Sequence, residues 1–369
     1  MVLLRDSWRS LALLVVMLAA ALVLAAACGD DDDESDGGPT TTQGDGGSPT
    51  QSSGEVEIDV GGGKTVTLDA SEPLSIAYFV VGTSNSYLQA NVDAAKAAAA
   101  EIGATIDVFD AEFTPEKQLN QVENALESGK YNAFVFQPVS GPQACDLISK
   151  DAPDKGILVS INIAQLCDRG FETGEELWQP GTLNYVGSTT TLEYYQAWAE
   201  QIASENPGPQ KVLFVVGPEG NVPVEAAKRA MQAVADENPD FEVTVVHTDY
   251  TSADGLAKTQ NYLQANDDVT IVATNYAELT KGALTALDEA SLGSVKVYDY
   301  GGDPSVLDAI RSGKVVMTTP YYPASAATES IMSLYDALQG KPIERVIPEV
   351  PGAQVFITAD NVDTFEPEY

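Results

Sequence analysis

The side chains that perform nucleophilic, acid–base or metal chemistry are scarce in this sequence and are not spaced for it. His247 is the single histidine, and no Gly-x-Ser-x-Gly turn supplies the nucleophile that a catalytic dyad needs. The cysteines Cys145 and Cys167 lack the paired spacing of zinc ligands, and no second histidine could complete such a site. We therefore expect a protein that is not an enzyme and has no metal and no cofactor, with His247 in a structural role.

Cys28 stands directly after an apolar segment, and its surroundings predict a chemical role. An uninterrupted apolar run covers 11–27 after two arginines, which is the layout of an export signal. The small residues before Cys28 resemble the lipobox of bacterial lipoproteins, although Ala25 stands where that motif prefers Leu. The resemblance implies a signal peptide over 1–27 and a lipid on Cys28, which would hold the protein at the outer face of the cell membrane. An uncleaved anchor and a plain secreted protein are the alternatives.

The segment after Cys28 is polar and strongly acidic. From residue 28 to residue 73 we predict a disordered acidic tether, because such a composition buries too little apolar surface to offset the entropy of ordering, and like charges extend the chain. The whole chain has 55 Asp and Glu against 19 Lys and Arg, a formal net charge of -36. Nucleic-acid binding needs basic surface, so we exclude that class of partner.

The rest of the chain alternates apolar runs with helical patterns. Several runs are continuous and rich in Val, Ile, Phe and Tyr, as in strands that are covered on both faces. This alternation predicts an α/β fold of two doubly wound parallel-sheet lobes, with a single eight-fold barrel as the alternative. In open sheets of this kind, ligands bind beyond the carboxyl ends of the strands. The runs are LSIAYFVVG, ATIDVFD, YNAFVFQP, GILVSIN, LNYVG, KVLFVVG, FEVTVVH, VTIVATN, VKVYDYG and KVVMTTP.

An ordered set of segments resembles the type I periplasmic binding proteins of the ribose-binding group, the receptors of sugar ABC importers. It includes SNSYLQANVDAAKAAAAEIGA, EKQLNQVENALESGKYNAFVFQPVS, TNYAELTKGALTAL and DPSVLDAIRSGKVVMTTPYYP. The resemblance implies two lobes joined by three crossovers, which close on a ligand without chemical reaction. One lobe would comprise 74–188 plus 322–349, and the other 189–321 plus 350–369.

The same resemblance implies a set of ligand-binding residues in the cleft between the lobes. Aromatic faces suit a sugar because its apolar ring surface can stack on them, and an amide offers a donor and an acceptor to hydroxyl groups. The positions that match the family pattern are Asn85, Tyr87, Gln137, Tyr250, Asn275 and Tyr321.

The sequence also departs from the family at its charged ligand-binding positions. Ala227 stands where the family has an arginine, and Gly301 stands where it has an aspartate, with Asp299 as a neighbour. The pair Asp168 and Arg169 lies a few residues after the place where the family has such a pair. We therefore take Asp168, Arg169 and Asp299 as further candidates and expect an unusual sugar, a polyol, a nucleoside-like molecule or another small polar metabolite.

An insertion over 165–182 leaves the carboxyl end of a strand and is expected to overhang the cleft. Phe171 and Trp178 could form a lid over a ligand, which makes Trp178 a further candidate, or could pack the loop on its own lobe. Cys145 and Cys167 follow neighbouring strands, and exported proteins meet oxidising conditions, so we predict a disulfide between them. Two separate buried thiols are the alternative.

Taken together, these patterns predict a lipid-anchored extracytoplasmic solute receptor. We expect a monomer that binds a small polar ligand, with sugars as the leading class, and that docks on the membrane permease of an ABC importer. A sensory receptor for a membrane kinase and an exported enzyme on the same fold are the alternatives.

Overall fold

Two open six-stranded sheets carry the fold of the computed structural model, which describes residues 54–350 and 355–369. In the first sheet all neighbouring strands are parallel. Its order is β13-β7-β6-β5-β3-β4, with bounds β3 (Ser75–Val80), β4 (Thr105–Asp110), β5 (Ala133–Phe136), β6 (Leu158–Asn162), β7 (Asn184–Val186) and β13 (Val346–Ile347). The single-barrel alternative is wrong, because the described strands form open sheets with free edges.

The second sheet is parallel except for its last strand, which pairs antiparallel with β12. The predicted two-lobed α/β fold is confirmed, and all ten quoted runs form strands. The order of this sheet is β14-β12-β11-β10-β8-β9, with bounds β8 (Gln210–Val216), β9 (Phe241–His247), β10 (Ile271–Thr274), β11 (Lys296–Gly301), β12 (Met317–Pro320) and β14 (Ile357–Thr358).

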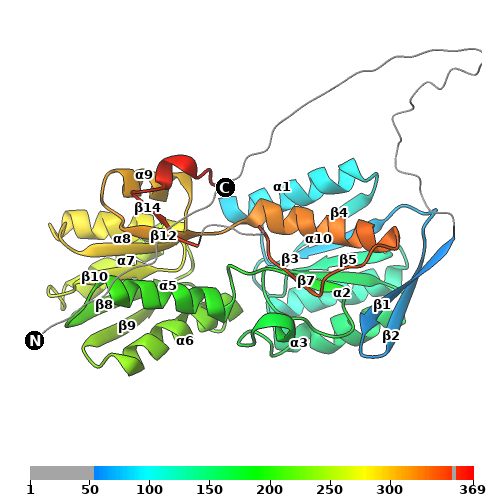
Figure 1. The fold of residues 1–369 in the computed structure, drawn as a ribbon, viewed down its shortest axis with the longest axis horizontal. Helices are drawn as coiled ribbons and strands as arrows, with labels where there is room; N and C mark the ends of the chain where they lie inside the picture. The colour runs from blue at the N-terminus through cyan, green and yellow to red at the C-terminus, as the bar shows by residue number, and fades with distance from the viewer. Residues whose placement is uncertain (1–53, 351–354) are drawn as a thin grey trace, which may run out of the picture. The chain divides into compact units, whose positions relative to one another are not determined.

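Helices cover both sheets (Figure 1). Around the first sheet lie α1 (Ser86–Glu101), α2 (Pro115–Ser128), α3 (Gly141–Asp146), the π-helical turn η1 (Leu147–Asp151), α4 (Ala152–Asp154), the 3-10 turn η2 (Gly174–Leu177) and α10 (Pro323–Leu338). Around the second lie α5 (Leu192–Glu205), α6 (Val222–Glu237), α7 (Ser252–Leu263), α8 (Ala277–Glu289), α9 (Pro304–Arg311) and the 3-10 turn η3 (Val362–Thr364).

Strand β3 shows why its residues are apolar without interruption. Successive side chains of a strand point to opposite faces of the sheet. Ile76 and Tyr78 therefore enter the core beneath α1 and α10, which lie side by side in Figure 1. Ala77 and Phe79 enter a second core with α2. Both faces are buried, which explains why the five residues after Ser75 are apolar or aromatic.

The predicted disordered tether over 28–73 is wrong at its carboxyl end. At this end of the segment, the strands β1 (Glu55–Gly61) and β2 (Lys64–Asp69) form an antiparallel hairpin. Its alternate side chains are buried in the core that also contains α1 and α10, and these are Ile58, Val60, Val66 and Leu68. The prediction of disorder used the average composition of the segment, which does not show that every second residue of these two strands is apolar. The predicted signal peptide, Cys28 and the tether up to residue 53 lie outside the described residues.

The chain passes between the two sheets three times, after β7, after β12 and after β13. Glu349 ties the first and third passages together, because its buried carboxylate accepts hydrogen bonds from the hydroxyls of Ser188 and Thr189. The distance from the Thr189 Oγ1 to the carboxylate is 2.9 Å. These bonds hold the first and third connecting segments together.

The C-terminal segment connects both halves as well. Its strand β14 belongs to the second sheet, whereas the carboxylate of Glu368 accepts the backbone N–H groups of Ala324 at 2.8 Å and Ser325 at 3.0 Å. These donors belong to the first turn of α10, where helix N–H groups have no partner within the helix. The negative charge also suits the positive end of the helix dipole.

We predict that Glu368→Ala lowers the free energy of unfolding by about 1–2 kcal/mol, because the first turn of α10 loses its acceptor. Urea unfolding followed by circular dichroism measures this loss. Glu366→Ala is the matched control, since Glu366 lies exposed in the same segment and should change stability by less than about 0.5 kcal/mol. Equal effects of the two substitutions would contradict the capping role.

Candidate ligand-binding site

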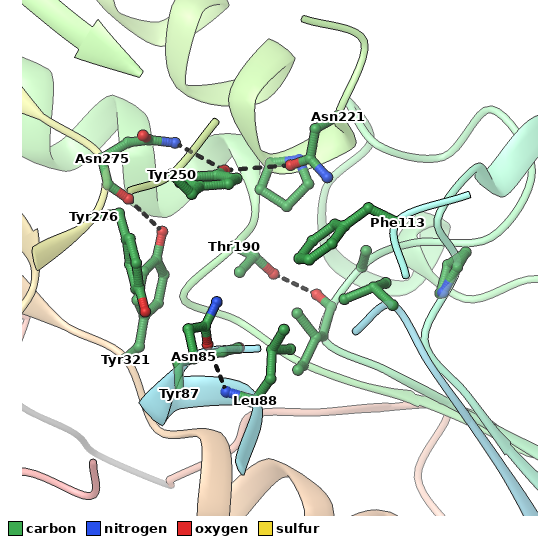
Figure 2. A pocket seen from close by; sticks show the side chains of 15 residues that line it. Asn85, Tyr87, Leu88, Phe113, Thr190, Asn221, Tyr250, Asn275, Tyr276 and Tyr321 are labelled. Atoms are coloured by element: carbon green, nitrogen blue, oxygen red, sulfur yellow. Dashed lines mark hydrogen bonds between the residues drawn. The ribbon is translucent and has the colours of Figure 1, made fainter. Parts of the chain in front are cut away.

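A cavity of about 90 Å³ lies where the loops that follow the strands of both sheets meet (Figure 2). Parallel strands place their carboxyl ends at the same edge of a sheet, which is where open α/β sheets bind ligands. The first sheet and its helices contribute Val81, Asn85, Tyr87, Leu88, Phe113, Pro138, Ile163 and Ala164. The second contributes Asn221, Pro223, Tyr250, Asn275 and Tyr276, and the connecting segments add Thr190 and Tyr321.

The structure brings the predicted ligand-binding residues together in this cavity, with one exception. Asn85, Tyr87, Tyr250, Asn275 and Tyr321 all line it, and their contact with a ligand stays a prediction.

Gln137 is the exception. Its side chain is buried, and its amide donates to the Tyr78 hydroxyl at 2.5 Å and to the Asn91 Oδ1 at 2.8 Å. Its Oε1 accepts the backbone N–H of Val81. Gln137 therefore does not line the cavity in this structure, and its contact with a ligand stays a prediction. The following residue, Pro138, lines the cavity instead.

Asn85 has two roles that follow from its place before α1. It is the N-cap of this helix, and its Oδ1 accepts the Leu88 backbone N–H at 2.9 Å. An asparagine in this position satisfies a helix donor that otherwise has no partner. The bond fixes the side chain so that its amide nitrogen is directed into the cavity (Figure 2). One residue thus starts the helix and directs a donor into the cavity.

Asn275 and Tyr250 form a hydrogen-bonded wall on the opposite side. The Asn275 Oδ1 accepts the Gly217 N–H at 3.2 Å, and its amide nitrogen lies 3.4 Å from the Tyr250 hydroxyl. That hydroxyl lies 3.4 Å from the Oδ1 of Asn221 (Figure 2). The Tyr250 ring covers Gly217 so closely that a Cβ there would meet the ring at 2.0 Å. Glycine is required because the ring occupies the space of a side chain.

Tyr321 connects the cavity to a buried group of tyrosines. Its hydroxyl lies 2.7 Å from that of Tyr195 and donates to the Asn275 carbonyl oxygen at 3.2 Å. Its ring lies 5.4 Å from that of Tyr87 and 5.1 Å from that of Tyr300.

Desolvation raises the pKa of Tyr87, Tyr250 and Tyr321 above the ordinary phenol value. These phenols are therefore neutral at physiological pH, and they offer ring faces without charge.

Backbone strain gathers at the cavity. Phe113, Ile163 and Tyr250 have φ values of 56°, 67° and 67°, which side chains with a Cβ rarely adopt. They are three of the six non-glycine residues with positive φ in the described part of the chain. Such conformations cost of order 1–3 kcal/mol each and cluster at ligand-binding sites. Their grouping here supports the cavity as the functional site.

The remaining candidates do not line the cavity. Asp168 is exposed, and Arg169 is bound to Gln179 and Glu176 within its own loop. Asp299 is buried, and burial raises its pKa to about 6. Its carboxylate accepts from Thr318 at 2.6 Å and from the Gly302 N–H at 3.0 Å. The structure thus does not bring Asp168, Arg169 and Asp299 into the cavity, and their role in ligand binding stays a prediction.

Trp178 packs the insertion onto its own half of the protein. Its ring covers Gly61 of the hairpin and lies 4.5 Å from the guanidinium carbon of Arg345. Its indole N–H donates to the Thr182 carbonyl oxygen at 3.1 Å. For Trp178 the structure therefore shows the second alternative, in which the loop packs on its own half. Phe171 is half-exposed and lies 4.8 Å from the guanidinium carbon of Arg229 on α6.

The predicted disulfide between Cys145 and Cys167 is present in the structure. It joins α3 to the insertion, and the backbone N–H of Cys167 also donates to the Gly141 carbonyl oxygen at 2.9 Å. These bonds fix the start of the insertion just after the cavity residues Ile163 and Ala164.

Sequence reasoning missed several lining residues. Phe113, Thr190, Asn221 and Tyr276 follow β4, β7, β8 and β10 by two to five residues. The rule that binding loops follow the carboxyl ends of strands would have found them.

The geometry agrees with what comparison with known proteins finds. Residues 76–342 match the family described as periplasmic binding protein domain, and the chain belongs to this family of solute-binding proteins. It is 25% identical over 286 residues to the ribose import binding protein of Escherichia coli, covering 77% of this chain and 91% of that protein. Identity to the D-apiose import binding protein of Actinobacillus succinogenes is 24% over 251 residues, covering 68% and 76%.

Solved structures share the fold. An ABC transporter solute binding protein from Mycobacterium smegmatis with bound glycerol has a TM-score of 0.68 and 21% identity, covering 79% of this chain and 96% of that one. A solute binding protein from Bacillus halodurans with bound myo-inositol has a TM-score of 0.69 and 20% identity, covering 80% and 99%.

Across 54–350 and 355–369, no helix has both the length and the apolar character of a membrane span. In the same ranges, no group of three or more His, Cys, Asp and Glu side chains is arranged to hold a metal ion.

We predict that Gly217→Ala lowers the free energy of unfolding by about 1–3 kcal/mol, because the new methyl group displaces the Tyr250 ring. Urea unfolding measures the change. In a Tyr250→Ala background the same substitution should cost much less, since the ring is gone. Gly293→Ala is the control, because a Cβ there meets no atom within 4 Å. An unchanged cost in the Tyr250→Ala background would show that the ring does not sit on Gly217.

Proposed function

We propose that this protein is the extracytoplasmic receptor of an ABC importer and that it binds a small, uncharged, sugar-like molecule in the cavity between its two sheets. The observation that carries the proposal is the lining of this cavity. Loops from both halves place tyrosine rings and asparagine amides around one space. Rings stack on the apolar face of a sugar, and amides bond to its oxygens.

The relatives support a polyhydroxylated ligand of small size. Curated relatives are named for the import of ribose and D-apiose, and solved structures of this fold hold glycerol and myo-inositol. In this chain Asn85 and Tyr87 would contact the ligand from α1 and the turn before it. Tyr250 and Asn275 would contact it from the second half, with Tyr321 at the connection.

A ligand held by both halves would favour the arrangement in which they are close. Ligands stabilise the conformation that they bind better, and hinge closure around a ligand is a common form of this change. The three passages between the sheets are the place for such a hinge. A permease in the membrane would recognise the closed form of a monomeric receptor. The rival role is a sensory receptor for a membrane kinase, which would use the same ligand-binding cavity.

The anchor belongs to the proposal as well. Export through the signal 1–27 and a lipid on Cys28 would attach the protein to the outer face of the cell membrane. The acidic segment up to the hairpin would then act as a tether, since like charges keep it extended.

An exported enzyme on this fold is disfavoured, because the cavity lining contains no Asp, Glu, His, Lys, Cys or Ser that could act as acid, base or nucleophile.

We predict that a panel of neutral sugars, polyols and nucleosides contains a ligand that raises the melting temperature. Stabilisation reaches about 4 kcal/mol when the free ligand is at about 1,000 times its Kd. Thermal shift finds the ligand, and calorimetry then measures its Kd.

Tyr250→Ala should weaken binding of that ligand by about tenfold or more through the loss of a stacking face. Tyr262→Ala on α7, away from the cavity, should leave the Kd unchanged. Turnover of the ligand by the protein would favour the enzyme instead.

We predict that Cys28→Ser releases the protein from the membrane fraction of cells and abolishes labelling with a radioactive fatty acid. The serine hydroxyl cannot form the thioether that carries the lipid. Gly29→Ala, which changes the next residue and keeps the thiol, should leave both readouts unchanged. Membrane retention of the Cys28→Ser protein at unchanged length would instead identify an uncleaved anchor, and unlabelled wild-type protein in the medium would identify a secreted one.

A further inference from the structure

The insertion reaches from the first half of the protein to the rim of the cavity on the second half. Its Gly170 is buried, and a Cβ at this position would lie 2.6 Å from the Cγ1 of Val222. Val222 is the first residue of α6 and stands between Asn221 and Pro223, which both line the cavity. The insertion therefore contacts α6 at the turn that supplies two cavity residues.

Phe171 makes a second contact with the same helix. Its ring lies 4.8 Å from the guanidinium carbon of Arg229, which is within the range of a cation–π interaction. Arg229 follows Val222 by seven residues, or about two helical turns, so both contacts lie on one face of α6. We call Gly170 and Phe171 the tip of the insertion.

The first turn of α6 has no side-chain cap of its own. Asn221 is the N-cap residue, but its side chain accepts no backbone N–H of the helix. Its Oδ1 instead lies 3.4 Å from the Tyr250 hydroxyl in the cavity (Figure 2). Asn85, by contrast, caps α1 with its side chain. A side-chain cap commonly fixes the first turn of a helix, and at α6 the tip contacts this turn from outside.

The tip is itself held by the first half of the protein. The disulfide between Cys145 and Cys167 joins the insertion to α3 three residues before Gly170. Arg169 donates to the side chain of Gln179 at 2.7 Å and to the carbonyl oxygen of Glu176 at 2.6 Å, so the two arms of the insertion are bonded to each other. The tip is thus fastened to the first half while it contacts the second.

We propose that Gly170 and Phe171 are positioning residues for ligand binding, which hold the first turn of α6, and with it Asn221 and Pro223, at the cavity, and that the disulfide keeps them in place. This inference rests on the proposed receptor function and gives the insertion a part in it. The tip contacts are lost when the two halves separate. They therefore favour the arrangement in which the halves are close and slow the release of a bound molecule.

Amide hydrogen exchange of the full chain without ligand tests the contact. We expect Phe171→Ala to speed exchange across 222–229 and to leave α7 unchanged, because only α6 loses a neighbour. Phe171→Tyr keeps an aromatic ring for Arg229 and should exchange like the wild type. Glu172→Ala, which changes the exposed next residue, is the second control. Wild-type exchange across 222–229 in Phe171→Ala would overturn the inference, whether or not any sugar binds.

Reduction tests the part played by the disulfide. Both cysteines are partly exposed, so dithiothreitol can convert the disulfide to two thiols. We expect the reduced wild-type protein to show the same faster exchange across 222–229 as Phe171→Ala. Unchanged exchange after complete reduction, checked by the mass of the thiol-alkylated protein, would overturn the claim that the disulfide holds the tip.

The dissociation rate separates positioning from a general loss of stability. The probe is the neutral sugar, polyol or nucleoside of the panel that gives the largest thermal shift. We expect Phe171→Ala to raise its dissociation rate about two- to fivefold, the size of an exposed cation–π interaction, while the melting temperature without ligand stays within a few degrees. Arg229→Ala should have the same effect, and the double variant should be no worse than either single variant.

Two failures are distinguishable in this measurement. An unchanged dissociation rate in Phe171→Ala would overturn the positioning role and leave the receptor function standing. If the wild-type protein binds no member of the panel, the proposed receptor function falls and the positioning role falls with it, whatever the exchange across 222–229 shows.

Discussion

Parallel strand pairing is the constraint on which the site depends. In each sheet every strand of the parallel set ends at the same edge, so that its following loop reaches the same place. Two such sheets, joined by short passages, bring residues far apart in the sequence around one cavity. Asn85 and Asn275 thus face the same space although 190 positions separate them in the numbering. These loops supply most of the cavity lining, whereas the sheets hold the loops in place.

Neutral hydrogen bonds, rather than ion pairs, organise the wall of the cavity. The Asn275 side chain accepts the backbone N–H of Gly217 and donates to the Tyr250 hydroxyl. The Tyr321 hydroxyl bonds to the Tyr195 hydroxyl and to the carbonyl oxygen of Asn275. A buried polar group must keep its partners, so these bonds fix the rings in one arrangement. The side chains of the wall therefore hold one another in place through bonds within the protein. Preorganisation of this kind reduces the entropy that binding must overcome.

The sequence predicted the sheets better than the site because strands covered on both faces leave continuous apolar runs. It missed the hairpin of β1 and β2, whose apolar side chains alternate within an acidic, glycine-rich segment. Gln137 has the residue type and position of a ligand contact, but Tyr78 and Asn91 occupy its amide. Trp178 has a large aromatic side chain that could cover a ligand, but its ring packs on the hairpin, where Gly61 has no side chain to exclude it. Such outcomes depend on three-dimensional neighbours that no local pattern contains.

The central claim is that one ligand is held by both halves of the protein at once. Amide hydrogen exchange, measured by mass spectrometry with and without the sugar that gives the largest thermal shift, tests it directly. Our account predicts slower exchange on binding both at 81–88, after β3, and at 275–280, after β10. Slower exchange confined to the loops of one sheet would contradict a site shared between the two.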